Sequence, residues 1–273
     1  MKRAIIIFIS TLALINVAHF IFGKRAIKHE TINFHDASRD NRPVPVAITV
    51  RFDKEMQANA GWIILPVAVL NHGNTVKNTG YSFLADFFAE RGYLVISPEH
   101  DLPTDPPMVT KPGQPYDGRL PQLRRGVANI NCVLKEMKSV QPNADYDHLT
   151  MVGHSMGGDI AMYFAMQYPD KVRKVVTLDN LRVPIIVSSK LKILSFRSKD
   201  PHFAADSGVM PSEPDVEKAG ITILRTPFQH NDMRDSGPDA AKDLIEGDLD
   251  EFLDQTDGKA ALTAGQRLED HKL

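Results

Sequence analysis

The chain has 273 residues, a length that suits one large α/β domain better than two average domains and a linker. Apolar residues make up 42% and charged residues 24%, which is typical of a globular protein and excludes disorder, collagen and coiled coil. Lys and Arg total 32 against 34 Asp and Glu, a net charge of −2, so no basic excess indicates a nucleic-acid partner. The only cysteine, Cys132, excludes an intrachain disulfide and a Cys-x-x-Cys metal site.

Residues 1–22 have the pattern of an export segment. Met1-Lys2-Arg3 gives a basic start, and residues 4–22 are mostly apolar. This pattern is typical of a secretory signal peptide, and the stretch is also near the minimum length for an uncleaved membrane anchor. Either one would place the rest of the chain outside the cytoplasm, in the periplasm or secreted; an ordinary buried helix is the alternative.

The next segments are expected to alternate between strands and helices. Residues 23–45 are predicted to be a linker, because residues 31–42 are polar and without periodicity. Strands are predicted at residues 46–52, in the second half of 62–70 and at 93–97, with a helix at 81–91. Residues 98–119 contain six prolines and no periodicity, so we expect a long functional or mobile loop there.

The alternation continues toward the C-terminus. Helices are predicted at residues 121–139, 156–167 and 240–253, and strands at 148–152, 172–178, 192–196 and 221–225. Strands that alternate with helices predict an α/β fold with a mostly parallel sheet and helices on both faces. We expect this domain to span residues 46–255, with a polar tail at 256–273. Catalytic groups in such sheets gather beyond the carboxyl ends of the strands.

A serine lies between a predicted strand and a predicted helix, within Gly153-His154-Ser155-Met156-Gly157. A nucleophilic serine needs a turn so sharp that its backbone is strained, and glycines two residues before and after let strand and helix pass closely. At the helix N-terminus, backbone N–H groups and the helix dipole favour a developing negative charge. The motif and its context therefore predict that Ser155 is a nucleophile.

The chain from about Val67 to Leu253 resembles the α/β-hydrolase family. The resemblance rests on a His-Gly turn after an early strand, the elbow around Ser155 and a late histidine after the last strand. It implies a serine hydrolase of esters, amides or thioesters that needs no cofactor and no metal. Relatives with aspartate at the elbow act on carbon–halogen bonds or epoxides, and Ser155 argues against those chemistries.

A serine nucleophile needs a histidine base and a carboxylate, which follow in the order serine, acid, histidine in this fold. The histidines downstream of Ser155 are His202, His230 and His271. His271 lies in the polar tail, and His202 directly follows a strand, where the acid is expected. His230 lies in the loop between the last strand and the C-terminal helix, which is the family position of the base.

Three aspartates are candidates for the acid. Asp200 follows the predicted strand 192–196, which is the usual family site, and it is our preferred acid. Asp179 ends the preceding strand, a site that some relatives use, and it is the alternative. Asp206 is a third candidate. If Asp179 is not the acid, we expect it to cap a turn or line the pocket.

The resemblance also implies an oxyanion hole formed by the backbone N–H groups of Asn74 and Met156. Gly73, one residue earlier, would let the chain turn toward the nucleophile. Loss of one such donor typically costs about 3 kcal/mol of transition-state stabilisation. We expect His72 to brace this loop, and Asp159, in the first turn after the elbow, to complement the helix dipole.

The sequence predicts an exported serine hydrolase, most simply a carboxylesterase that acts on a small ester or amide through an acyl-enzyme. About 13 residues separate the strands 172–178 and 192–196, too few for a large helical cap, so residues 98–119 are the candidate cover. Their possible polar contacts to a substrate are Asp101, Asp105, Tyr116, Asp117 and Arg119. An amidase or peptidase, a thioesterase and an acyltransferase are alternatives with the same motifs. A non-catalytic binding protein that kept the fold is an alternative of another class.

Overall fold

The computed structural model describes residues 26–108 and 115–256. Its strands are β1 Ile27–Asp36, β2 Arg42–Arg51, β3 Leu65–Asn71, β4 Leu94–Pro98, β5 Ala144–His154, β6 Val172–Leu178, β7 Lys192–Arg197 and β8 Thr222–Arg225. Its α-helices are α2 Phe52–Asn59, α3 Ser82–Glu90, α4 Pro115–Val140, α5 Met156–Gln167, α6 Glu213–Ala219 and α7 Asp239–Thr256. Two short 3₁₀ helices are η1 Pro201–Phe203 and η2 His230–Asp232.

The strands form one eight-stranded sheet in the order β1-β2-β4-β3-β5-β6-β7-β8. β1, β2 and β4 pair antiparallel, and every pair from β4–β3 to β7–β8 is parallel. The carboxyl ends of the parallel strands therefore meet at one edge of the sheet, where α/β folds place their binding groups.

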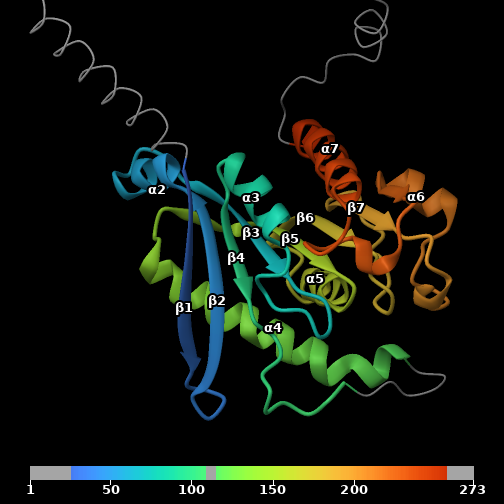
Figure 1. Ribbon diagram of the computed structural model, residues 1–273, viewed down its shortest axis with the longest axis horizontal. Coiled ribbons are helices and arrows are strands. Elements are labelled where there is room, and N and C mark those ends of the chain that lie inside the picture. The colour runs from blue at the N-terminus through green and yellow to red at the C-terminus, as the bar shows by residue number, and fades with distance from the viewer. Residues whose placement is uncertain (1–25, 109–114, 257–273) are drawn as a thin grey trace, which may run out of the picture.

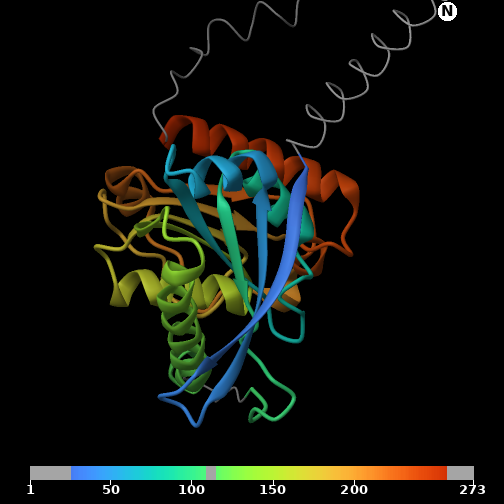
Figure 2. The same ribbon diagram turned by 90° about the vertical axis from the view of Figure 1, so that its left-hand side faces the viewer.

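Helices cover both faces of this sheet (Figures 1 and 2). On one face α4 and α5 bury residues such as Ile130 and Ile160 against the sheet. On the other face α3 and α7 bury residues such as Phe88 and Ile245. All five residues of β4 are buried, as expected for a strand covered on both sides. The mostly parallel sheet with helices on both faces is confirmed.

The predicted linker at residues 23–45 contains strands. β1 and β2 form an antiparallel hairpin at the edge of the sheet, with Ile27 opposite Arg51 and Asp36 opposite Arg42. Only alternate side chains of the outer part of β1 are partly buried, so its sequence carries little apolar periodicity. The turn of this hairpin contains Asp40 and Asn41, whose φ angles are 50° and 54°. Two consecutive positive φ angles are typical of hairpin turns, and Asp and Asn adopt them more readily than most residues.

The structure also adds two short helices that the sequence pattern does not predict. α2 directly follows β2, and α6 precedes β8. The predicted loop 98–119 is shorter than expected, since α4 begins at Pro115. The remaining predicted elements appear with bounds within a few residues, and α5 and β6 match their predicted ranges.

Residues 1–22 and the tail beyond Thr256 lie outside the described part of the chain, so the predicted export segment is not described. Within residues 26–108 and 115–256, no helix is long and apolar enough to cross a membrane.

Three backbone segments approach closely where β5 passes into α5. A Cβ at Gly153 would lie 2.2 Å from the carbonyl carbon of Gly157, and a Cβ at Gly157 would lie 2.0 Å from the carbonyl oxygen of Asn71. Real Cβ atoms do not approach backbone atoms this closely. The two glycines are therefore required for β5, α5 and the end of β3 to meet at this point.

We expect Gly157→Ala to lower the free energy of unfolding by about 3 kcal/mol or more, because backbone on both sides must move. Gly247→Ala in α7 is the matched control, since no atom lies within 4 Å of its added Cβ. That change should stabilise the protein by roughly 0.5–1 kcal/mol. Urea unfolding of both variants measures the difference, and equal effects would contradict the steric argument.

Candidate active site

Ser155 lies on the turn between β5 and α5 in a strained backbone conformation. Its φ is 53° and its ψ is −120°, a region that residues with a side chain rarely adopt. The Ser155 N–H donates to the carbonyl of Leu178 at 2.8 Å, and the Ser155 carbonyl accepts from the N–H of Asp159 at 3.0 Å. Hydrogen bonds on both sides therefore hold the strained serine at the N-terminus of α5.

His230 lies directly against a buried carboxylate. Its Nδ1 is 2.7 Å from Oδ2 of Asp179, and both side chains are only 2% exposed. A carboxylate can only accept, so Nδ1 carries the proton and Nε2 of the neutral ring is left as an acceptor. His230 and Ser155 line the same cavity, of about 370 Å³. The cavity is thus lined by a serine and by a histidine whose ring is held by a carboxylate.

The preferred acid, Asp200, is not the carboxylate that contacts His230. Its Oδ1 accepts from the backbone N–H of His202 at 3.0 Å, and this contact caps η1. The His202 ring nearby is 88% exposed. The expected Asp200–His230 pair is therefore wrong: the carboxylate that contacts His230 is that of Asp179, the alternative, at the end of β6, whereas the Asp200 carboxylate is used to cap η1.

Two residues that the sequence analysis did not single out hold Asp179. Ser198 donates its hydroxyl to Oδ2 at 2.6 Å and its N–H to Oδ1 at 3.2 Å. The Arg197 guanidinium lies 3.2 Å from Oδ1. Burial opposes ionisation, but His230, Arg197 and Ser198 together hold the pKa of Asp179 below its usual range. Arg197 ends β7 and Ser198 follows it, and β7 pairs with β6. Their position at the carboxyl end of a predicted strand was the sequence feature that could have pointed to them.

Phe203 covers one face of the His230 ring. The two rings are stacked, with centroids 4.0 Å apart and planes inclined by 3°. Phe203 belongs to η1, the short helix that Asp200 caps. Asp200 therefore does not contact His230 itself; it caps η1, and Phe203 of η1 packs against the His230 ring.

The residues predicted for the oxyanion hole lie at the same cavity. Asn74 and Met156 both line it together with Ser155 and His230. Within the described residues, neither backbone N–H donates a hydrogen bond to another protein group. Both donors are therefore available to a substrate oxygen, and the assignment of the oxyanion hole to them is taken up below as a proposal.

His154 links the loop of His230 to the loop of Gly73 through Tyr81. Its Nε2 lies 2.9 Å from the carbonyl oxygen of His230, and its Nδ1 lies 2.8 Å from the Tyr81 hydroxyl. That hydroxyl also accepts from the N–H of Gly73 at 3.0 Å. A carbonyl only accepts, so His154 donates from Nε2 and accepts at Nδ1, and Tyr81 donates to it. Burial and the neighbouring His230 lower the pKa of His154, so the ring is neutral and Nδ1 is free to accept from Tyr81.

Asp159 has a different role from the expected dipole contact alone. Its Oδ1 accepts from the backbone N–H groups of Leu181, Arg182 and Val183 at 3.2, 2.9 and 2.9 Å. Asp159 is 3% exposed, and burial raises its pKa to about 6 although these bonds favour the carboxylate. It fixes the loop that follows Asp179 against α5, and Asp159, Leu181 and Arg182 line the cavity.

Two residues on either side of the undescribed stretch 109–114 line the cavity, Met108 from the segment after β4 and Arg119 from α4. His72 braces the neighbouring loop: its Nδ1 is 2.9 Å from the Gly73 carbonyl, and its Nε2 accepts from the His100 N–H at 2.8 Å.

In the described ranges, no group of three or more His, Cys, Asp or Glu side chains is arranged to hold a metal ion.

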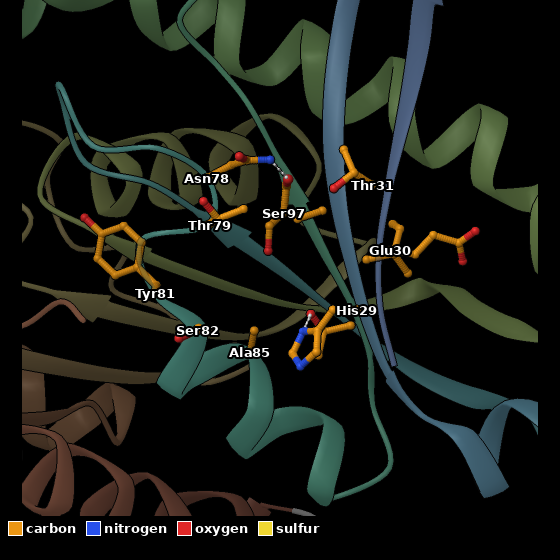
Figure 3. A pocket seen from close by; sticks show the side chains of 12 residues that line it. His29, Glu30, Thr31, Asn78, Thr79, Tyr81, Ser82, Ala85 and Ser97 are labelled. Atoms are coloured by element: carbon orange, nitrogen blue, oxygen red, sulfur yellow. Dashed lines mark hydrogen bonds between the residues drawn. The ribbon is translucent and has the colours of Figure 1, made fainter. Parts of the chain in front are cut away.

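A second cavity, of about 160 Å³, lies between the β1–β2 hairpin and α3 (Figure 3). It is bordered by Tyr81, by Ser97 and by Asn78, whose amide donates to the Ser97 carbonyl at 2.7 Å. Ser155, Asp179 and His230 are absent from its walls. We therefore place the candidate active site in the larger cavity.

The neutral His154 predicts a pH dependence of stability. Burial, and then the neighbouring His230, lower the pKa of His154 from 6.5 to about 3. Between these values the unfolded chain binds a proton that the folded chain excludes, so stability falls as pH decreases from about 6.5, by up to about 1.4 kcal/mol per pH unit. His154→Gln should make this decline shallower in urea unfolding between pH 4.5 and 7. Parallel curves for the two proteins would contradict the prediction.

Comparisons with known proteins agree with the fold. A family model described as the alpha/beta hydrolase fold matches residues 134–199, which contain the elbow and Asp179. A ferulic acid esterase from Streptomyces cinnamoneus has a TM-score of 0.58 and 16% identity, over 85% of this chain and 90% of that one. A dienelactone hydrolase-like promiscuous phosphotriesterase from metagenomic libraries has a TM-score of 0.57 and 11% identity, over 84% and 98%. The chain has the α/β-hydrolase fold.

Proposed function

We propose that the protein is a serine hydrolase that cleaves small carboxylic esters through an acyl-enzyme on Ser155. The observation that carries the proposal is the 2.7 Å hydrogen bond from His230 to buried Asp179, at a cavity that Ser155 also lines. Serine, histidine and aspartate in this chain order are the groups that activate a hydroxyl in this fold. The esterase among the structural relatives adds support for the ester class.

In the first half of the reaction, Nε2 of His230 accepts the hydroxyl proton of Ser155 while Oγ forms a bond to the ester carbonyl carbon. The imidazolium that results is stabilised by Asp179, which stays ionised because Arg197 and Ser198 hold its charge. His230 then gives the proton to the departing alkoxide, and the alcohol leaves. In the second half, water repeats these steps on the acyl-enzyme and releases the carboxylic acid.

The carbonyl oxygen becomes negatively charged in each tetrahedral intermediate. We assign the two donors that bind it to the N–H groups of Asn74 and Met156, which border the cavity and have no other protein acceptor among the described residues. Preorganised donors of this kind are worth about 3 kcal/mol each in comparable enzymes. The same geometry would serve an amide or thioester, so turnover of matched short esters and amides is the measurement that ranks these substrates.

The first test is covalent labelling. A fluorophosphonate should label the wild-type protein and should not label Ser155→Ala, because only an activated serine attacks the phosphorus. Mass spectrometry of the labelled peptide identifies the modified residue. Labelling of the Ser155→Ala variant would overturn the assignment of the nucleophile, and an unlabelled wild-type protein would favour a non-catalytic binding protein.

The second test separates the two candidate acids. Asp179→Asn should lower kcat by a factor on the order of 10⁴, since the His230 ring loses its charged partner and its correct tautomer. Asp200→Asn should change kcat little, because the amide oxygen can still cap η1. Steady-state kinetics on a short ester measures both variants. A larger loss in Asp200→Asn than in Asp179→Asn would return the acid to the position first expected from the sequence.

We further propose that residues 1–22 export the protein, on the strength of the basic start and the apolar stretch in the sequence. The eight-stranded sheet and its covering helices are formed by residues after Ala26. Deletion of residues 2–25 should therefore leave the thermal midpoint and ester turnover unchanged while it prevents export. Unfolding of the truncated protein would instead make the segment part of the fold, and N-terminal sequencing of exported protein distinguishes cleavage from anchoring.

A further inference from the structure

Three arginines line the cavity that contains Ser155. They are Arg119, Arg182 and Arg234, and they come from α4, from the loop after β6 and from the segment after η2. Asp159 is the only carboxylate among the lining residues. Its carboxylate is already engaged by three backbone N–H groups, and its pKa is raised by burial. The lining of the cavity thus has an excess of positive charge, although the whole chain has a net charge of −2.

The three arginines differ in how their charge is balanced. Arg182 forms an ion pair with Asp206. Arg119 lies in the electrostatic range of both Asp159 and Asp206 and contacts the sulfur of Met108. Carboxylates of the protein therefore offset the charge on this side of the cavity.

Arg234 has no such balance. Within the described residues, no carboxylate lies within ion-pair distance of its guanidinium, and its Nε is buried without a hydrogen-bond partner. Its charge reaches the site: it opposes the rise that burial causes in the pKa of Tyr81, and it adds to the lowering of the pKa of His154, which is caused mainly by burial and His230. A guanidinium that loses part of its hydration without a partner is costly, and such groups are characteristic of binding sites that await an anion.

Arg234 is placed where it can act on a substrate. It follows His230 by four residues and lines the cavity together with Asn231 and the oxyanion loop from Gly73 to Val76. A group bonded to Ser155 would therefore share this cavity with a forked donor that suits the two oxygens of a carboxylate. The cavity volume of about 370 Å³ restricts such a substrate to a small molecule.

We propose that the substrates are small esters that carry a carboxylate, and that Arg234 binds this carboxylate and sets the preference for it. The cleavage of these esters rests on the serine hydrolase function proposed above. The binding of a carboxylate by Arg234 does not depend on that function. Arg119 and Arg182 contribute positive potential from the other lining segments, while Asp159 and Asp206 hold them in place.

The test compares two esters of equal shape and different charge. Monobutyl succinate carries a carboxylate, and butyl 4-methylpentanoate carries an isopropyl group in its place; butanol release reports kcat/KM for both. The wild-type protein should prefer the anionic ester, and Arg234→Gln should lower the anionic-to-neutral ratio about 10- to 100-fold, mainly through KM, because a charged hydrogen-bonded pair is lost. Arg234→Lys, which keeps the charge without the fork, should lose only part of the ratio.

Arg124→Gln is the matched control, because Arg124 is an exposed arginine of α4 that does not line this cavity and its loss changes the net charge by the same amount. It should leave both kcat/KM values unchanged. An unchanged ratio in Arg234→Gln, or an equal change in Arg124→Gln, would overturn the proposal. If Arg234→Gln does not fold, the Arg234→Lys variant decides in its place, and a ratio equal to that of the wild type counts against the carboxylate contact.

Binding of an uncleaved analogue keeps this result separate from the hydrolase assignment. N-butylsuccinamate should bind the Ser155→Ala protein in a calorimetric titration, and the added Arg234→Gln change should weaken binding by about 10-fold or more. If no ester is turned over and this binding pattern is still observed, the hydrolase proposal fails and the anion site stands. If the analogue does not bind, or binds equally to both proteins, the anion site is overturned.

Discussion

The candidate site depends on the close meeting of three backbone segments at the carboxyl edge of the sheet. β5 turns into α5 against the end of β3, and this is possible because Gly153 and Gly157 have no Cβ to collide with Asn71 and with each other. The same meeting forces Ser155 into a positive φ and presents it at the N-terminus of a helix. The position of Ser155 and that of the loop after β3 are therefore set by one packing constraint.

Around this point the protein keeps one buried charge and one buried neutral ring, each for a physical reason. Asp179 stays ionised because three partners offset the cost of burial. His154 stays neutral because burial, and then the neighbouring His230, lower the pKa of its ring to about 3. The base loop, the elbow and the oxyanion loop are linked through Tyr81 and His154, so a disturbance in any of them is transmitted to the others.

The elements that hold the site are also those that shape its charge. Asp159 binds the loop of Leu181 to Val183 to α5, and that loop carries Arg182 to the cavity. Asp206 pairs with Arg182 from the segment before α6. Arg234 lies four residues after His230, just beyond η2, and has no carboxylate partner in the described chain. The fold thus assembles a cationic cavity from a chain of nearly balanced charge.

The sequence by itself determined the parallel sheet, the order of its main elements, and the positions of Ser155 and His230 on loops after strands, because these follow from local periodicity and from glycine spacing. It did not determine β1, whose edge position leaves no apolar pattern to read. It also did not choose between Asp179 and Asp200, since both follow strands and differ only in which strand end meets the loop of His230. The tertiary structure decided this: β6 lies next to β5, and the carboxylate of Asp179 lies beside His230, whereas that of Asp200 caps η1. Distances across a sheet depend on strand order, which no local pattern encodes.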